Sequence, residues 1–197
     1  MANAQKVTEP PSPPNPPSTP FIQLSATTFN HPTYGTLRPC LVPETVSYAS
    51  PVSPSVFEGH CESLLASYPV QRLLSDSNMS IPTYITPFKR MFATHMRLAH
   101  FDKNIFNVTV FWSNAEVRER EGYGRAGAGG DLILGWEEHF EAEWVLAEGD
   151  VEEGLAFKGG FWGKEGPDSR SPGGTGKDSA EVWFGKIQNF TNRPLKM

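Results

Sequence analysis

Two stretches of the chain alternate between apolar and polar residues, which is the pattern expected of β-strands. In the longer stretch, residues 132–147, apolar side chains fill most alternate positions, with glutamates and a histidine between them. Residues 105–119 begin with a similar alternation. The glycine-rich segment 122–130 joins them, which predicts a hairpin with a flexible loop. Shorter strands are predicted at 21–24, 44–48, 155–162 and 181–190.

The first half of the chain has a different period. Apolar residues recur at three- and four-residue intervals over 54–68 and again over 87–100, which predicts two helices. Pro69 follows the first helix, as expected where a helix ends. His95 falls on the apolar stripe of the second helix. The intervening segment 74–85 is predicted to be a loop.

Helices before residue 101 and strands after it predict an α+β fold, in which a curved, mostly antiparallel sheet packs against helices. Residues 21–190 form the single predicted domain. The proline-rich segment 1–20 is predicted to be an extended, disordered tail. Residues 163–179 are predicted to be a second flexible loop, and residues 191–197 a short tail.

Composition excludes several function classes. The net charge is −5, and no run of Lys or Arg exceeds two residues, so neither nucleic acid nor an anionic membrane is a predicted partner. No apolar run is long enough for a membrane span or a signal peptide, which favours a soluble cytoplasmic protein. The two cysteines, Cys40 and Cys61, lack metal-site spacing and are predicted to be reduced thiols.

A Gly-x-Gly-x-x-Gly match at Gly122, Gly124 and Gly127 is the only sign of a nucleotide cofactor. A strand follows it, whereas a phosphate cradle requires a helix N-terminus. Neither a cofactor nor a metal is therefore predicted.

Several short phrases resemble the SnoaL-like branch of the NTF2-like superfamily, over roughly residues 41–148. A short strand at 41–48 leads into a helix that opens at 55–58 and closes at 67–69, and two long strands follow. The resemblance implies a cone made of a curved sheet closed by helices. It also implies a small hydrophobic ligand in an apolar interior, and cofactor-independent acid/base chemistry of an isomerase, cyclase or dehydratase.

Glu138 is the main catalytic candidate, because it falls on the apolar face of its strand, where burial would favour its protonated form. His95 would be the proton-transfer partner. Alternatively, a bulge near Gly135 would return Glu138 to solvent, and His95 would be an ordinary core residue. The residues predicted to line the ligand site are Trp112, Asn114, Trp136, Phe140 and Trp144.

His139 with Glu137, Glu141 and Glu143 forms the polar face of the longer strand. A solvated outer face is predicted there rather than a metal site, because neighbouring carboxylates repel one another without a cation.

Two further functions remain open. One is a non-catalytic association module of the same fold, which forms a homodimer through the aromatic-rich face of the sheet while the proline tail contacts a partner. The other is a lipocalin-like carrier, which two helical segments and too few predicted strands disfavour.

Overall fold

The computed structural model describes residues 14–42, 58–67, 70, 73–74, 81–90, 93–113, 133–159, 161 and 175–187, with side chains given except at 58, 89–90, 112–113 and 133–139. The predicted strand 44–48, the glycine-rich loop 122–130 and most of the loop 163–179 lie outside these residues.

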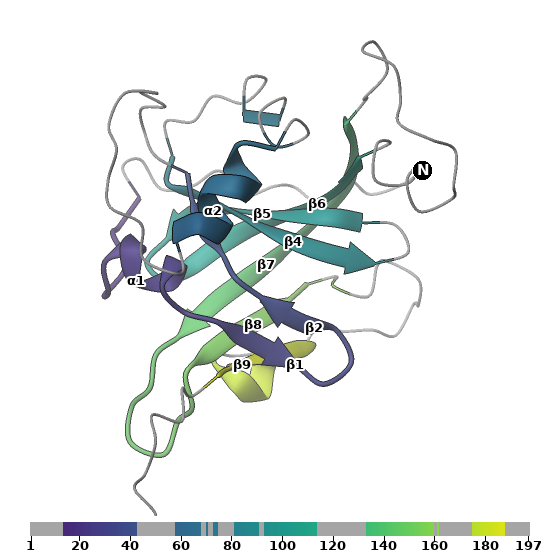
Figure 1. Cartoon of the computed structure of the whole chain (residues 1–197). Coiled ribbons are helices and arrows are strands. Elements are labelled where there is room, and N and C mark those ends of the chain that lie inside the picture. The colour runs from purple at the N-terminus through teal and green to yellow at the C-terminus, as the bar shows by residue number, and fades with distance from the viewer. Residues whose placement is uncertain are drawn as a thin grey trace, which may run out of the picture.

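One antiparallel sheet of nine strands dominates the described part of the chain (Figure 1). The strands follow the order β2-β1-β9-β8-β7-β6-β5-β4-β3. Each neighbouring pair is consecutive in sequence except β1 and β9, so the sheet is an up-and-down meander that β1 extends by pairing with β9. The predicted curved antiparallel sheet is confirmed. The strands are β1 (Phe29–His31), β2 (Gly35–Leu37), β3 (Cys40–Leu41), β4 (Thr83–Arg90), β5 (Ala93–Asp102), β6 (Ile105–Ser113), β7 (Ile133–Val145), β8 (Gly154–Lys158) and β9 (Val182–Lys186).

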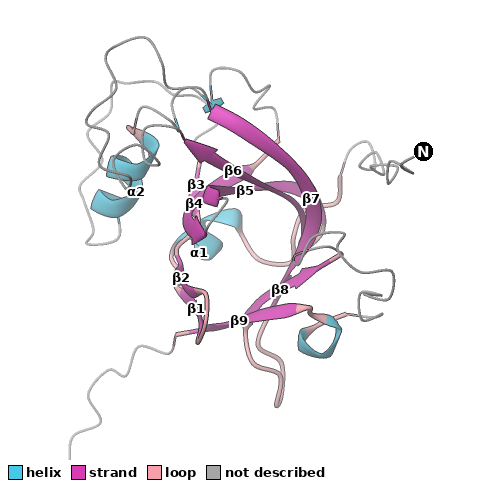
Figure 2. Ribbon diagram, turned by 90° about the vertical axis from the view of Figure 1, so that its right-hand side faces the viewer, coloured by secondary structure: helices cyan, strands magenta, loops and turns pink. Residues whose placement is uncertain are grey.

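The sheet curls until its two edges approach each other, and Figure 2 shows this incomplete ring nearly end-on. Leu37 ends β2 and Cys40 begins β3, so two residues of chain connect the edge strands. The backbone N–H of Arg38 donates to Thr86 Oγ1 of β4 at 3.2 Å. We call this junction between β2 and the β3–β4 edge the seam.

The concave side of the sheet holds the main core. Phe106 and Val108 of β6 face Ala142 and Phe140 of β7 across the ladder, and all four are buried. The alternation in the two long stretches therefore gives the core face, as predicted. Aromatic rings fill the concave side, with Phe161 lying 5.6 Å from Phe140 between ring centroids. The aromatic-rich face is thus covered within the chain itself.

A short helix, α1 (Phe21–Ser25), lies across one end of the ring, where a strand was predicted (Figure 2). Phe21 and Leu24 are three residues apart and both pack against the main core, which accounts for a helical turn at this position. The hydroxyl of Tyr84 donates to the carbonyl oxygen of Phe21 at 2.7 Å. This hydrogen bond ties α1 to the sheet.

The helix α2 (Glu58–Leu65) confirms the helix predicted over 54–68, and it lies outside the ring beside β3 and β4 (Figure 2). Its Leu64 joins a second buried cluster on the convex side of the sheet. The other buried members of that cluster are Cys40, Val42, Val70, Ile85 and Phe111.

The helix predicted over 87–100 is wrong, because these residues belong to the β4–β5 hairpin. Phe88 and Met96 both enter the main core, so two adjacent strands reproduce a spacing that also suits a helix. The carbonyl oxygen of Thr83 accepts from the N–H of Val42, so the backbone groups of Thr83 face β3. The backbone of every second residue of β4 faces the same edge, and Pro87 is therefore directed to the β3 side as well. It lies beyond the last residue that pairs with β3, so no ladder hydrogen bond is lost and the proline is tolerated.

The prediction of reduced thiols is also wrong. Cys40 and Cys61 form a disulfide with Cα atoms 5.4 Å apart, which joins β3 to α2 across 21 residues of sequence. Crosslinking a loop of this length stabilises a fold by about 3 kcal/mol.

The end of the proline-rich tail is anchored to the β5–β6 turn. Asp102 Oδ1 accepts from the backbone N–H of Asn15 at 2.9 Å and from its side-chain amide at 2.8 Å. The side-chain hydrogen bond from Asn15 is the main reason that the pKa of Asp102 lies below its ordinary value. Ser18 bonds to Asn104 in the same turn.

Within the described residues, no helix has the length and apolar character needed to cross a membrane.

Candidate functional site at the seam

A cavity of about 380 Å³ opens at the seam. Three segments that are distant in sequence contribute to it: residues 34–38, from the β1–β2 turn to the end of β2 and just beyond, helix α2 and strand β4. The lining residues are Tyr34, Thr36, Arg38, His60, Pro87 and Phe88.

The β1–β2 turn that presents Tyr34 is organised by one imidazole. Nδ1 of His31 accepts from the backbone N–H of Thr33 at 3.0 Å and from that of Tyr34 at 3.2 Å. Gly35 has φ of +76°, a left-handed conformation that glycine adopts without strain. The turn places the ring of Tyr34 edge-on to Phe161, at 5.4 Å between centroids. The aromatic side of the cavity is therefore continuous with the main core.

Strand alternation supplies the polar side of the cavity. Leu37 is buried in the main core, so its neighbours Thr36 and Arg38 project to the opposite, outer side. Arg38 is exposed, and its guanidinium forms no ion pair with the described residues. Phe88 is only 3% exposed and packs toward the core. The cavity is consequently amphipathic, with polar groups outside and rings inside.

His60 enters from α2, on the helix face that carries Leu64 one turn later. Its Nε2 is buried and has no hydrogen-bond partner among the described residues. The disulfide explains how His60 reaches the seam, because Cys61 follows His60 and Cys40 lies two residues after Arg38. The crosslink therefore holds the two basic residues at one cavity.

This arrangement suits recognition of an anionic oxygen group. A guanidinium presents a planar set of N–H donors that matches carboxylate, sulfonate or phosphate, and charge-assisted hydrogen bonds of this kind are the strong ones. The buried imidazole nitrogen and the Tyr34 and Thr36 hydroxyls add polar groups. Across the described residues, no cluster of three metal-ligating side chains occurs.

Several residues predicted to form the site lie outside the description. The side chains of Glu138, Trp112 and Trp136 are not described, and Asn114 lies outside the described residues altogether. The backbone of β7 shifts register opposite Val110, between the pairs Thr109–His139 and Phe111–Gly135. This bulge spans residues 136–138, close to Gly135 as the alternative interpretation expected. The catalytic role of Glu138 stays a prediction.

The structure does not bring His95 together with Phe140 and Trp144, the two residues of the predicted aromatic wall whose side chains are described. His95 is 3% exposed and stacks on Phe111 at 5.4 Å, with 9° between the ring planes. Its Nδ1 hydrogen bonds to Thr94 at 2.8 Å. Phe111 belongs to the convex cluster under α2, whereas Phe140 and Trp144 lie in the concave core. His95 and these two aromatic residues therefore occupy opposite sides of the sheet.

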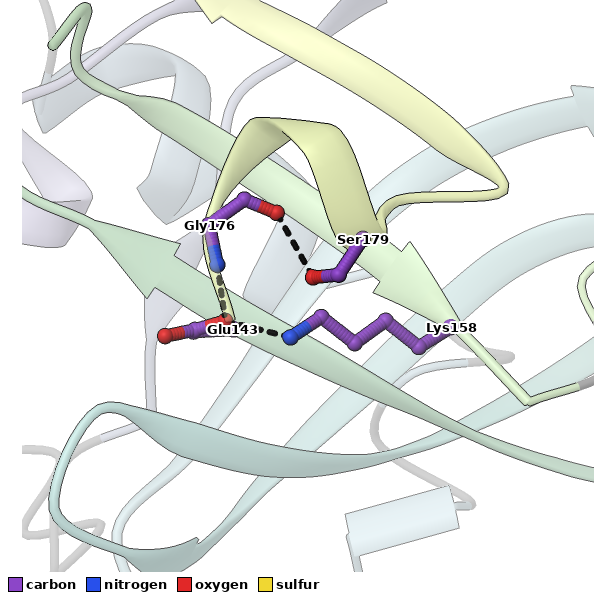
Figure 3. A network of polar contacts seen from close by, with 4 residues as sticks. All are labelled: Glu143, Lys158, Gly176 and Ser179. Carbon is purple, nitrogen blue, oxygen red and sulfur yellow. Dashed lines mark hydrogen bonds and ion pairs between the residues drawn. The ribbon is translucent and has the colours of Figure 1, made fainter. Parts of the chain in front are cut away.

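Glu143 is not the solvated side chain that the alternation predicts. Its carboxylate accepts from Lys158 Nζ at 2.5 Å and from the N–H of Gly176 at 2.9 Å, and its side chain is 19% exposed (Figure 3). Ser179 donates to the carbonyl oxygen of Gly176, which completes the network around the 3-10 helix η1 (Lys177–Ser179). The network fixes this helix on the sheet, and the charges of Glu143 and Lys158 are paired with each other.

A second hollow, of about 770 Å³, lies at the β7–β8 turn and the end of β9. Its lysine is already paired, since Lys186 Nζ contacts Glu153 at 2.7 Å. Glu152 pairs with Lys177 at the same distance. The seam cavity is smaller, but it is the better candidate because Arg38 has no ion pair with the described residues.

Comparison with known proteins adds no assignment: no family model, curated protein or solved structure matches the chain.

Sequence reasoning missed Tyr34, Thr36, Arg38 and His60 as site residues. One signal was available, because a basic residue lies within two positions of each of the two cysteines.

Proposed function

We propose that this chain binds a small amphipathic anion at the seam cavity. The observation that carries the proposal is the lining, in which Arg38 and His60 face a space that Tyr34 and Phe88 border from the core side. The volume of about 380 Å³ falls within the range of small-molecule sites, which begins at about 300 Å³. The ligand class is an oxyanion, such as a carboxylate or sulfonate, attached to an apolar body that includes a ring.

The predicted resemblance to SnoaL-like proteins contributes one part of this proposal, a small ligand held by a curved sheet. The NTF2-like cone is the more specific form of the same prediction. The curled sheet supports its general part, a curved antiparallel sheet. A carrier function gains support as well, because nine strands replace the small number that disfavoured a lipocalin-like carrier. Binding without chemistry is therefore the simplest form of the proposal.

The acid/base reaction is a second candidate that depends on Glu138 and His95. The bulge that includes Glu138 favours it in one respect, because β-bulges commonly occur beside active sites. The variants Glu138→Gln and His95→Ala test it on an identified substrate. Full turnover by both variants would eliminate this mechanism.

The homodimer alternative does not enter the proposal. The aromatic-rich face that was expected to pair is packed inside the chain's own core. Among the described residues, the large apolar side chains that are exposed are Ile22, Val151 and Ile187. Light scattering at several concentrations tests self-association independently of ligand binding.

Two dyes of similar shape test the anion site. Anilinonaphthalene sulfonate is an amphipathic anion, and N-phenylnaphthylamine is a closely related neutral compound. Replacing Arg38 by glutamine removes a charge-assisted hydrogen bond worth about 1.5–3 kcal/mol, so the anionic dye should bind about 10- to 100-fold more weakly. Binding of the neutral dye should change by less than about twofold. Fluorescence titration provides both dissociation constants.

Lys186→Gln is the matched control, because it removes a cation from the second hollow. It should leave the affinity for the anionic dye unchanged. If Lys186→Gln weakens binding and Arg38→Gln does not, the ligand site has been placed at the wrong end of the sheet.

A further inference from the structure

The disulfide is close in sequence to both basic residues of the seam cavity. Cys40 follows Arg38 by two residues on the sheet, and Cys61 follows His60 directly on α2. Arg38 is fixed to the sheet by its backbone, through the hydrogen bond to Thr86. The position of His60 depends instead on where α2 lies.

Among the described residues, two kinds of interaction hold α2 on the sheet. One is apolar: Leu64 belongs to the convex cluster that includes Ile85 and Phe111, and Leu65 packs against it. The other is the disulfide, whose two sulfurs lie between the helix and β3. Cys40 is fully buried, whereas Cys61 is partly exposed, so a small thiol can approach the Cys61 end of the bond.

We propose that the Cys40–Cys61 disulfide is a redox switch for anion binding at the seam. This inference rests on the proposed function, and it adds the regulation of that site. In the oxidised protein the crosslink keeps His60 at the cavity opposite Arg38. In the reduced protein α2 leaves the sheet for part of the time, and the anion loses the His60 side of its site.

The chemistry is a two-electron reduction by a dithiol. A thiolate of the dithiol attacks one sulfur and forms a mixed disulfide, and its second thiolate then releases the protein thiol. The Sγ–Sγ bond breaks, Cys40 and Cys61 each gain a proton, and the dithiol becomes a cyclic disulfide. No other reactant is required.

The direction of the switch has a clear physical consequence. Disulfides persist in oxidising compartments and are rare in the cytosol. The chain would therefore hold its ligand under oxidising conditions and release it under the reducing conditions of the cytoplasm, where the sequence predicts the protein to be.

The expected size follows from the fraction of protein that is competent to bind. The apparent dissociation constant equals the intrinsic one divided by that fraction, so a docked fraction of about one tenth raises it about tenfold. The main core contains neither cysteine and should stay folded.

The experiment is a titration of the full chain with anilinonaphthalene sulfonate before and after reduction by dithiothreitol, with thiol counting to confirm that the bond is broken. The double variant Cys40→Ser/Cys61→Ser repeats the comparison without reductant. We expect the dissociation constant to rise about tenfold in both cases. In the His60→Gln variant, reduction should have a much smaller effect, because the group that moves has already been removed.

The outcomes separate the two proposals. If the oxidised protein does not bind the dye, the proposed function is wrong. If the oxidised protein binds and the fully reduced protein binds equally well, the function stands and the switch is wrong. Near-ultraviolet circular dichroism follows the buried aromatic core, and loss of that signal on reduction would also overturn the switch, because the change would then be global unfolding.

Discussion

Replacing Tyr84 by phenylalanine removes one oxygen atom at the end of the sheet that α1 covers. Tyr84 is fully buried, and its hydroxyl donates to the carbonyl oxygen of Phe21 at 2.7 Å. Losing this hydrogen bond in a buried place costs about 1–2 kcal/mol. For a chain of this size the melting temperature should fall by roughly 2–8 °C.

The same variant should change how stability depends on pH. Burial raises the pKa of the Tyr84 phenol above its ordinary value of 10.0. The stability from keeping this phenol neutral is therefore complete below about pH 10, and it is lost at higher pH because the unfolded chain ionises first. At about pH 11 the unfolded state gains about 1.4 kcal/mol from ionising Tyr84, a gain that the phenylalanine variant lacks.

Urea unfolding at about pH 8 and about pH 11 measures both effects. The stability difference between the native protein and Tyr84→Phe should shrink by about 1.4 kcal/mol between the two conditions. Equal stability of the two proteins at the lower pH would refute the role of the hydroxyl. A difference that does not change with pH would refute the burial of a neutral phenol.

Four further substitutions, two tests and two controls, probe packing and charge, each by urea unfolding. Gly154→Ala should destabilise by about 1–3 kcal/mol, because a Cβ there would lie 2.3 Å from the ring of Trp183 and 2.7 Å from a backbone oxygen. Gly59→Ala, where a Cβ meets nothing within 4 Å, should be neutral or stabilising; equal losses in the two variants would contradict the close approach. Glu143→Ala removes a partly buried carboxylate with two hydrogen bonds and should cost about 1–2 kcal/mol. The exposed control Glu152→Ala should cost less than about 1 kcal/mol, and the reverse order would show that the Glu143 network is not structural.

The parts of the fold that the sequence predicts well are those with a long local period. In β6 and β7 the apolar residues alternate over enough positions to identify the core face. Strands β1, β2 and β3 have three residues or fewer, so they contain no measurable period. Without these strands the closing of the sheet could not be predicted.

The helix predicted over 87–100 failed for a different reason. Phe88 and Met96 lie eight residues apart, a spacing that fits one side of a helix and also two inward positions on adjacent strands. Pro87, at the start of the segment, is also compatible with the first turn of a helix. Its actual place, beyond the end of β3, depends on pairing with a strand far away in sequence.

The candidate site could not be predicted because its residues meet only through long-range contacts. Pairing of β1 with β9 carries Tyr34 and Thr36 to the seam, and the disulfide brings His60 to Arg38. Apart from the basic residue near each cysteine, no local pattern marks these residues. The predicted site instead followed the aromatic residues of the long strands, and Phe140 and Trp144 are packed in the core.

The location of the ligand is the central point, and amide NMR spectra of nitrogen-labelled protein can test it directly. Anilinonaphthalene sulfonate would be titrated into the oxidised chain while backbone signals are followed. The largest shifts should occur at Tyr34, Thr36, Arg38 and His60, around the seam cavity. Shifts concentrated instead in the second hollow, at residues 149–153 and 185–187, would contradict an anion site at the seam.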